Sequence, residues 1–94
     1  MAGLTLKGQS LESYIYPSDV DSIQTFAVAL VNELWVDNPL TNYGKYGLLF
    51  VIGVPFEGKL NRMSIQLVIA SFNGTSQAFI RTLWTGDWQP WKAI

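Results

Sequence analysis

The feature that most constrains the fold is the dipeptide Asn73-Gly74, which separates two apolar runs near the C-terminus. Asparagine and glycine tolerate the positive φ angles that a type I′ turn needs at both central positions, so the pattern predicts a β-hairpin. With Phe72 opposite Thr75, the register of both strands is set. One face is then almost wholly apolar and pairs Ile69 with Ala78, Leu67 with Ile80, Ile65 with Thr82 and Met63 with Trp84. The other face mixes apolar and polar groups and pairs Val68 with Phe79, Gln66 with Arg81 and Ser64 with Leu83.

A second reversal is predicted at Thr85-Gly86-Asp87, and it returns the chain along the hairpin as the final segment, residues 88–94. Pro90 in this segment has no N–H to donate to a strand ladder, so we expect the segment at an edge of the sheet. The last strands of the chain then hold three of its four tryptophans: Trp84, Trp88 and Trp91.

This C-terminal pattern resembles the knob domain that ends many phage tail fibres and pyocin fibres. The stretches that carry the likeness are Phe79-Ile80-Arg81, Gly86 and Trp88-Gln89-Pro90-Trp91-Lys92. Upstream, residues 22–30 (SIQTFAVAL) are similar to the short helix of those domains, and residues 43–51 (YGKYGLLFV) resemble the strand that follows it. The likeness covers about residues 18 to 94. It implies a receptor-binding protein that acts as a homotrimer on the virion tail and is produced in the host cytoplasm.

The segment from Asp21 to Glu33 is predicted to be a helix, with Asp19 and Asp21 at the end where a helix favours negative charge. The apolar residues at helical spacing are Val20, Ile23, Ala27, Leu30, Val31 and Leu34. A strand through Phe26–Leu30 is the alternative, because valine and phenylalanine favour strands.

The rest of the chain gives simpler signals. Residues 35–44 lose periodicity and gather Asn, Pro and Gly, which predicts a loop. Residues 46–54 predict an apolar strand covered by the helix on one face and by another subunit or sheet on the other. A turn-rich connection follows at residues 55–61. The predicted fold class is therefore α+β, a small antiparallel sheet with one packed helix.

Two regions follow from these signals. The resemblance implies that residues 18–94 are the knob domain and that residues 1–17 are an extended segment at a junction with a fibre shaft; a frayed terminus is the alternative. The first residues carry neither a charged n-region nor an apolar h-region, so no signal peptide is expected.

Composition indicates self-association. Of the 94 residues, 49% are hydrophobic and only 14% are charged, against about 25% charged in an ordinary soluble domain. The longest apolar run, residues 47–56, falls short of the ~20 residues of a membrane helix, so membrane insertion is not expected. The surplus apolar surface is better explained by a subunit interface, and the knob resemblance makes the assembly a trimer.

The sequence contains no cysteine and no histidine, which removes thiol nucleophiles, Ser-His-Asp triads and the usual zinc sites. The seven acids fall almost entirely at predicted turns and helix ends, so we expect no enzyme, no catalytic residue, no metal and no cofactor. The six cations are scattered and form no basic stripe, which argues against nucleic-acid binding.

Ligand binding would use exposed aromatic rings beside polar groups, as a sugar requires. The candidate residues are Trp35, Asp37, Asn38, Asn42, Tyr43, Arg81, Trp84, Asp87 and Trp88. The loop from Trp35 to Tyr43 is the favoured segment, because loops on a rigid sheet often carry function. Structural roles are the alternative: tryptophans of the last strands as core or inter-subunit packing, and Arg81 as a donor to a nearby backbone carbonyl.

Three functions remain open. The resemblance implies non-catalytic attachment to a host cell-surface glycan at the tip of a fibre, where multivalency makes weak single sites sufficient. The second hypothesis is a structural domain that trimerises and closes a fibre or baseplate without a ligand of its own. The third, a polysaccharide-degrading module, would need turnover that depends on one of the acids.

Overall fold

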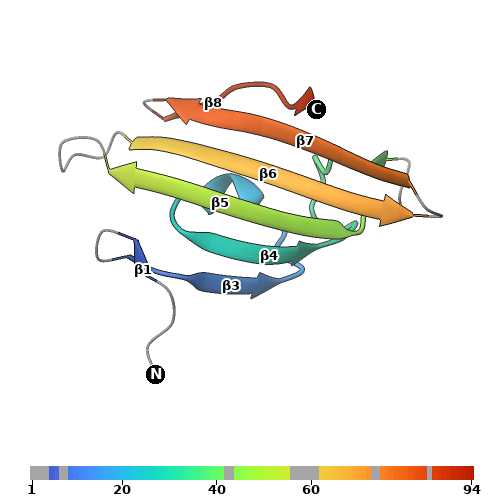
Figure 1. Ribbon diagram of the computed structural model, residues 1–94, viewed down its shortest axis with the longest axis horizontal. Coiled ribbons are helices and arrows are strands. Elements are labelled where there is room, and N and C mark those ends of the chain that lie inside the picture. The colour runs from blue at the N-terminus through green and yellow to red at the C-terminus, as the bar shows by residue number, and fades with distance from the viewer. Residues whose placement is uncertain (1–4, 7–8, 42–43, 56–61, 73–74, 85) are drawn as a thin grey trace.

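The computed structural model describes residues 5–6, 9–41, 44–55, 62–72, 75–84 and 86–94. Its main element is one mixed sheet with the strand order β3-β4-β5-β6-β7-β8, in which β9 also pairs with β7 (Figure 1). The strands of this sheet are β3 (Glu12–Ile15), β4 (Ala27–Val31), β5 (Gly47–Pro55), β6 (Arg62–Phe72), β7 (Thr75–Trp84), β8 (Asp87–Trp88) and β9 (Lys92–Ala93). Strands β1 (Thr5–Leu6) and β2 (Gln9–Ser10) form a separate two-stranded pair.

The β6–β7 hairpin has the predicted register. Phe72 pairs with Thr75, and the partners further along, Gln66 with Arg81 and Met63 with Trp84, are those expected from the sequence. The turn residues 73–74 lie outside the described residues. The predicted apolar strand at residues 46–54 is also confirmed as β5. Alternation of apolar residues with a period of two and a short turn are therefore enough to fix this part of the sheet.

The predicted helix from Asp21 to Glu33 is wrong, and with it the α+β fold class. Among the described residues the only helices are 3₁₀ turns, of which η1 covers Val20–Ser22, and Ala27–Val31 is strand β4. Strand β4 is parallel to β3 and antiparallel to β5, so the fold is all-β. Every second residue of β4 is buried and the residues between are more exposed, which is the period of a strand. Helical spacing also fitted this segment, because a continuous apolar run is compatible with both periods.

The edges of the sheet are made by short strands. Both β8 and β9 pair with β7, with Pro90 between them, so the final segment lies at an edge as predicted. At the opposite edge, β3 brings residues 12–15 of the expected N-terminal segment into the main sheet.

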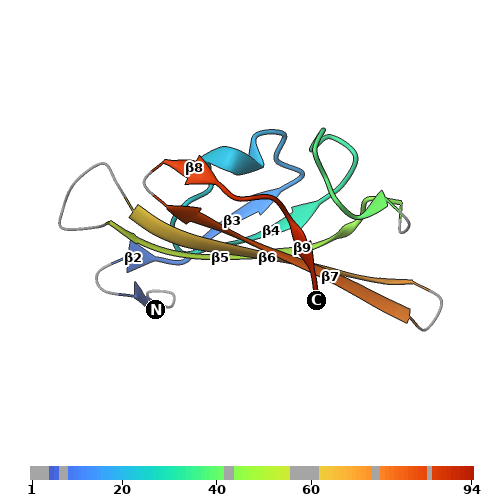
Figure 2. The same ribbon diagram turned by 90° about the horizontal axis from the view of Figure 1, so that it is seen from above.

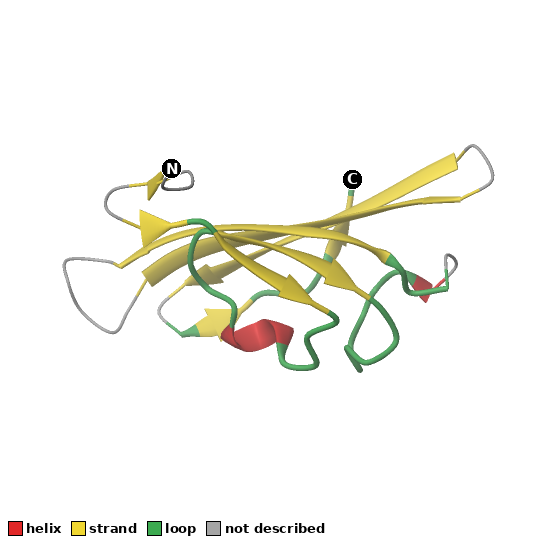
Figure 3. Cartoon of the chain, turned by 90° about the horizontal axis from the view of Figure 1, so that it is seen from below, coloured by secondary structure: helices red, strands yellow, loops and turns green. Residues whose placement is uncertain are grey.

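The two faces of the sheet differ. Figures 2 and 3 show η1 and the long loops gathered on one side, which we call the covered face. The other side, the open face, carries large apolar side chains that are each 36% to 52% exposed, and these are Leu30, Leu48, Phe50, Ile52, Met63, Ile65, Ile69 and Trp84. The core lies between the covered face and its loops and contains Val20, Ile23, Ala27, Ala29, Val31, Trp35, Leu40, Leu49, Val51, Val68 and Ala70.

Candidate functional site

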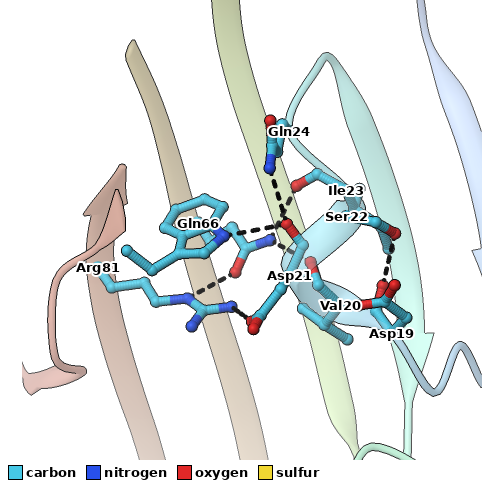
Figure 4. Close-up of polar contacts among 9 residues, drawn as sticks. Asp19, Val20, Asp21, Ser22, Ile23, Gln24, Gln66 and Arg81 are labelled. Atoms are coloured by element: carbon cyan, nitrogen blue, oxygen red, sulfur yellow. Dashed lines mark hydrogen bonds and ion pairs between the residues drawn. The ribbon is translucent and has the colours of Figure 1, made fainter. Parts of the chain in front are cut away.

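Polar side chains on the covered face hold the segment of residues 19–24 against the sheet (Figure 4). The Ser64 hydroxyl donates to the Gln24 carbonyl over 2.6 Å. The Gln66 amide nitrogen donates to the carbonyls of Val20 and Ile23 over 2.8 and 2.9 Å. These side chains are fully buried, and a buried polar group without a partner would cost about 1–3 kcal/mol. The carbonyls of Ile23 and Gln24 are thus satisfied by side chains of β6, while the Val20 carbonyl also accepts from the Ile23 N–H of the 3₁₀ turn.

Arg81 links this network to the end of the chain. Its Nε donates to Gln66 Oε1 over 2.8 Å, and its terminal nitrogen forms a 2.7 Å ion pair with Asp21 (Figure 4). Its guanidinium lies 4.3 Å from the ring centre of Trp88 and 4.5 Å from that of Trp91. Burial lowers the pKa of Arg81, and the hydrogen bond that Arg81 donates to Asp21 opposes that shift. A guanidinium stays a cation at neutral pH in proteins. These contacts give Arg81 a structural role.

The loop after β4 is organised by two asparagines. The Asn38 amide donates to the carbonyls of Asn32 and Lys45 over 3.2 and 2.6 Å, and its oxygen accepts from the Leu40 N–H over 2.9 Å. The Asn32 oxygen accepts from the Leu34 N–H over 3.0 Å. Such bonds replace a regular ladder and give the loop one conformation.

Trp35 anchors this loop in the core. It is 2% exposed and packs edge-on against Trp91, with 5.6 Å between the ring centres. Because its ring is covered, Trp35 offers little area on which a sugar could stack, although the residue next to it, Val36, is 79% exposed.

A shallow pocket lies where this loop meets the segment that contains η1. Its volume is about 100 Å³, and it is lined by Ser18, Asp19, Val20, Asp21, Trp35, Val36 and Asp37. Three of the lining residues are aspartates, Asp19, Asp21 and Asp37, and the Asp21 carboxylate also pairs with Arg81. Among the described residues no group of three or more acids is arranged to hold a metal ion. The pocket is instead suited to hydrogen-bond donors such as sugar hydroxyls, which carboxylates accept.

The structure separates the residues predicted to bind a ligand. Trp35 and Asp37 both line the pocket, and Arg81 and Trp88 contact Asp21 at its wall. Asn38 is buried inside its loop, Asp87 is exposed on β8, and Trp84 points to the open face. Asn42 and Tyr43 lie outside the described residues. The prediction of a glycan site on these residues stays a prediction.

Sequence reasoning missed the other side of the pocket, Ser18, Asp19 and Asp21. We assigned both aspartates to the N-terminus of an α-helix, but they lie at a single 3₁₀ turn, where Asp19 makes no side-chain capping hydrogen bond, and both line the pocket. Two aspartates separated by one residue, Asp19 and Asp21, are visible in the sequence. Nothing local in the sequence indicates that this segment lies against Trp35 and Asp37.

The open face is the second candidate site. Strands β4 to β7 contribute to it, and Leu48, Phe50 and Ile52 project from β5 while Leu49 and Val51 between them are buried. Cross-strand pairs such as Leu48 with Ile69 and Ile52 with Ile65 make the surface continuous.

Comparisons with known proteins do not assign the chain to a family: no family model, no curated protein and no solved structure matches it. The resemblance to a tail-fibre knob therefore stays a prediction made from the residues. None of the helices in the described part of the chain is long and apolar enough to cross a bilayer.

Proposed function

We propose that this chain is a non-catalytic attachment domain that binds a glycan of the host cell surface as part of a homotrimeric fibre tip on the virion tail. The observation that carries the proposal is the pocket between η1 and the loop after β4, with its carboxylates of Asp19, Asp21 and Asp37. Sugar hydroxyls donate well to such groups, and the exposed Val36 adds an apolar contact for the C–H side of a ring.

The size of the pocket limits its affinity. At about 100 Å³ it is smaller than the ~300–1,000 Å³ of sites that enclose a drug-sized ligand, so it suits one sugar unit at the end of a chain. A single contact of this kind is weak. Three copies on one fibre would raise the overall binding strength by ~10²–10⁴-fold without any new contact, which fits an attachment role.

Glycan binding should depend on the pocket and not on net charge. On a glycan array, we expect Asp37→Asn to lower the affinity for the wild-type ligand by about tenfold. This is the change in affinity expected from the loss of one charge-assisted hydrogen bond. Glu33→Gln is the matched control, because it makes the same acid-to-amide change at an exposed residue outside the pocket and should bind normally. Equal binding by the wild type and Asp37→Asn would contradict this site, and turnover of a bound polymer would contradict the non-catalytic role.

A structural assembly domain without a ligand is the second candidate function. The observation that favours it is the open face, where large apolar side chains from four strands are exposed in the single chain. Failure of the assembled protein to bind any glycan of the array, together with stable self-association, would favour this function over attachment.

A further inference from the structure

We propose that the open face is the surface through which copies of this chain join, so that a second copy covers Phe50, Ile52 and Ile65. This rests on the self-association in the proposed function and names the surface that joins the copies, but it does not depend on whether the pocket binds a glycan. It also assigns a place in the fold to the surplus of apolar side chains, which composition alone could not do.

The amount of apolar surface is the first argument. At about 200 Å² for a large apolar side chain, the eight side chains of the open face together present on the order of 700 Å² to solvent. The largest apolar patch of a typical monomer is about 300–600 Å², whereas a stable interface buries about 800 Å² on each partner. The open face therefore exceeds what a solitary domain ordinarily shows and matches what one partner contributes to a stable complex.

The distribution of charge is the second argument. Within the described residues the centre of the open face, on β5 and β6, carries no charged side chain. The described chain does carry charged residues at the edges of the sheet, where Asp87 of β8 pairs with Trp84, Lys92 of β9 pairs with Ile80, and Glu12 lies on β3 at the opposite edge. An apolar centre with a polar rim is the usual anatomy of a protein interface.

This rim also bears on the identity of the partner. One carboxylate and one ammonium on the same rim have no net charge to attract a strongly charged protein or an anionic lipid surface, which lysine-rich faces bind. A second copy supplies an ammonium for each carboxylate and a carboxylate for each ammonium, because symmetric interfaces present the same patch twice. These two charges thus cancel in every copy, so copies can meet at this edge without a net repulsion of like charge.

The shape of the sheet favours association by its face and not by its edges. The outermost strands are short, with four residues in β3 and two each in β8 and β9, and β8 and β9 cover β7 at Phe79, Ile80, Leu83 and Trp84, so only part of this edge is left for pairing with another chain. Sheets that pack face to face interdigitate their side chains at a spacing of about 10 Å, and the medium-sized side chains of β5 and β6 suit that spacing. Two copies about a two-fold axis or three about a three-fold axis can be built on this surface.

The test is the mass of the purified protein in solution, measured by light scattering and native mass spectrometry over a range of micromolar concentrations. We expect the wild type to have the mass of two or three chains, and a single-chain mass at every concentration would overturn the proposal. Phe50→Glu and Ile65→Glu should each weaken self-association by at least ~100-fold, because each places a carboxylate in the centre of the interface. Leu34→Glu is the matched control, since it makes the same kind of change at an exposed leucine outside the sheet and should keep the wild-type mass.

A second measurement keeps the test decisive if the charged variants fail to fold. A photoreactive phenylalanine analogue at Phe50 preserves the size and apolarity of the side chain, and illumination of the otherwise native protein should give crosslinks between copies. The same analogue at Leu34 should give none. Association that survives both glutamate variants, or crosslinks from position 34 but not from position 50, would overturn the proposal.

Discussion

The covered and open faces of the sheet use the same strands in opposite ways. On the covered face, buried polar side chains such as Gln66 and Arg81 each find a partner, and the loops that supply those partners are fixed in place. On the open face, apolar side chains outnumber polar ones and large fractions of them reach solvent. The comparison shows that hydrophobicity does not by itself identify the inner face of this sheet, because satisfied hydrogen bonds can bury a mixed face while an apolar face stays open.

The largest effect should come from Gly53, where β5 passes close to the covering segment. A Cβ atom added at this residue would overlap the Gln24 carbonyl and the Ser64 hydroxyl. Gly53→Ala must therefore push the segment away from the sheet and break the hydrogen bond between Ser64 and Gln24. We expect a loss of about 3 kcal/mol in the free energy of unfolding, measured by urea denaturation. A loss below about 1 kcal/mol would mean that the covering segment is held more loosely than its hydrogen bonds indicate.

The second-largest loss of stability is expected when a cation of the covered face is removed, and removal of a cation at the edge of the sheet serves as the comparison. Arg81→Met removes the ion pair with Asp21 and leaves Gln66 Oε1 without its donor, so we expect a loss of about 2–3 kcal/mol. Lys92→Met removes an exposed cation at the edge of the sheet and should change stability by less than about 0.5 kcal/mol. Equal effects in urea denaturation would contradict the assignment of Arg81 as a structural residue.

The smallest effect compares two neighbouring positions of β5 that point to opposite faces. Val51→Thr places a hydroxyl in the core and should cost about 1–2 kcal/mol, because Val51 is 1% exposed. Ile52→Thr, at 52% exposure, should cost less than about 0.5 kcal/mol when measured in the dispersed Phe50→Glu background. In the wild-type background the cost of Ile52→Thr should grow with protein concentration, because assembly then contributes to stability. A concentration-independent cost would argue against burial of Ile52 between copies.

How far the sequence predicts this structure depends on how local each signal is. The β6–β7 register could be predicted because the Asn73-Gly74 sequence signal and the alternation of residues beside it act over neighbouring positions. The segment after Asp21 could not, because its carbonyls are held by Ser64 and Gln66, which lie 40 or more positions away in sequence. Local spacing fitted a helix, and only these distant partners select the extended form.

The candidate sites show the same contrast between local signals, which the sequence reveals, and long-range contacts, which it does not. Trp35 and Asp37 were predicted from the composition of one loop, and the structure does place them at one pocket. Their neighbours Asp19 and Asp21 come from a segment whose position depends on the long-range hydrogen bonds of Gln66 and Arg81. The apolar side of the hairpin was predicted correctly, but the sequence does not say which side the loops would cover.

The alternation of buried and exposed residues along β5 and β6 makes these strands intolerant of changes in length. Inserting or deleting one residue in β5 would move Leu49 and Val51 to the open face and turn Phe50 toward the loops, so that both surfaces would be lost at once. The loops over the covered face carry no such alternation, so their exposed positions, such as Leu34 and Val36, can change as long as the anchors Trp35 and Asn38 stay in place. Related chains could therefore diversify their outer loops while the sheet keeps a fixed length.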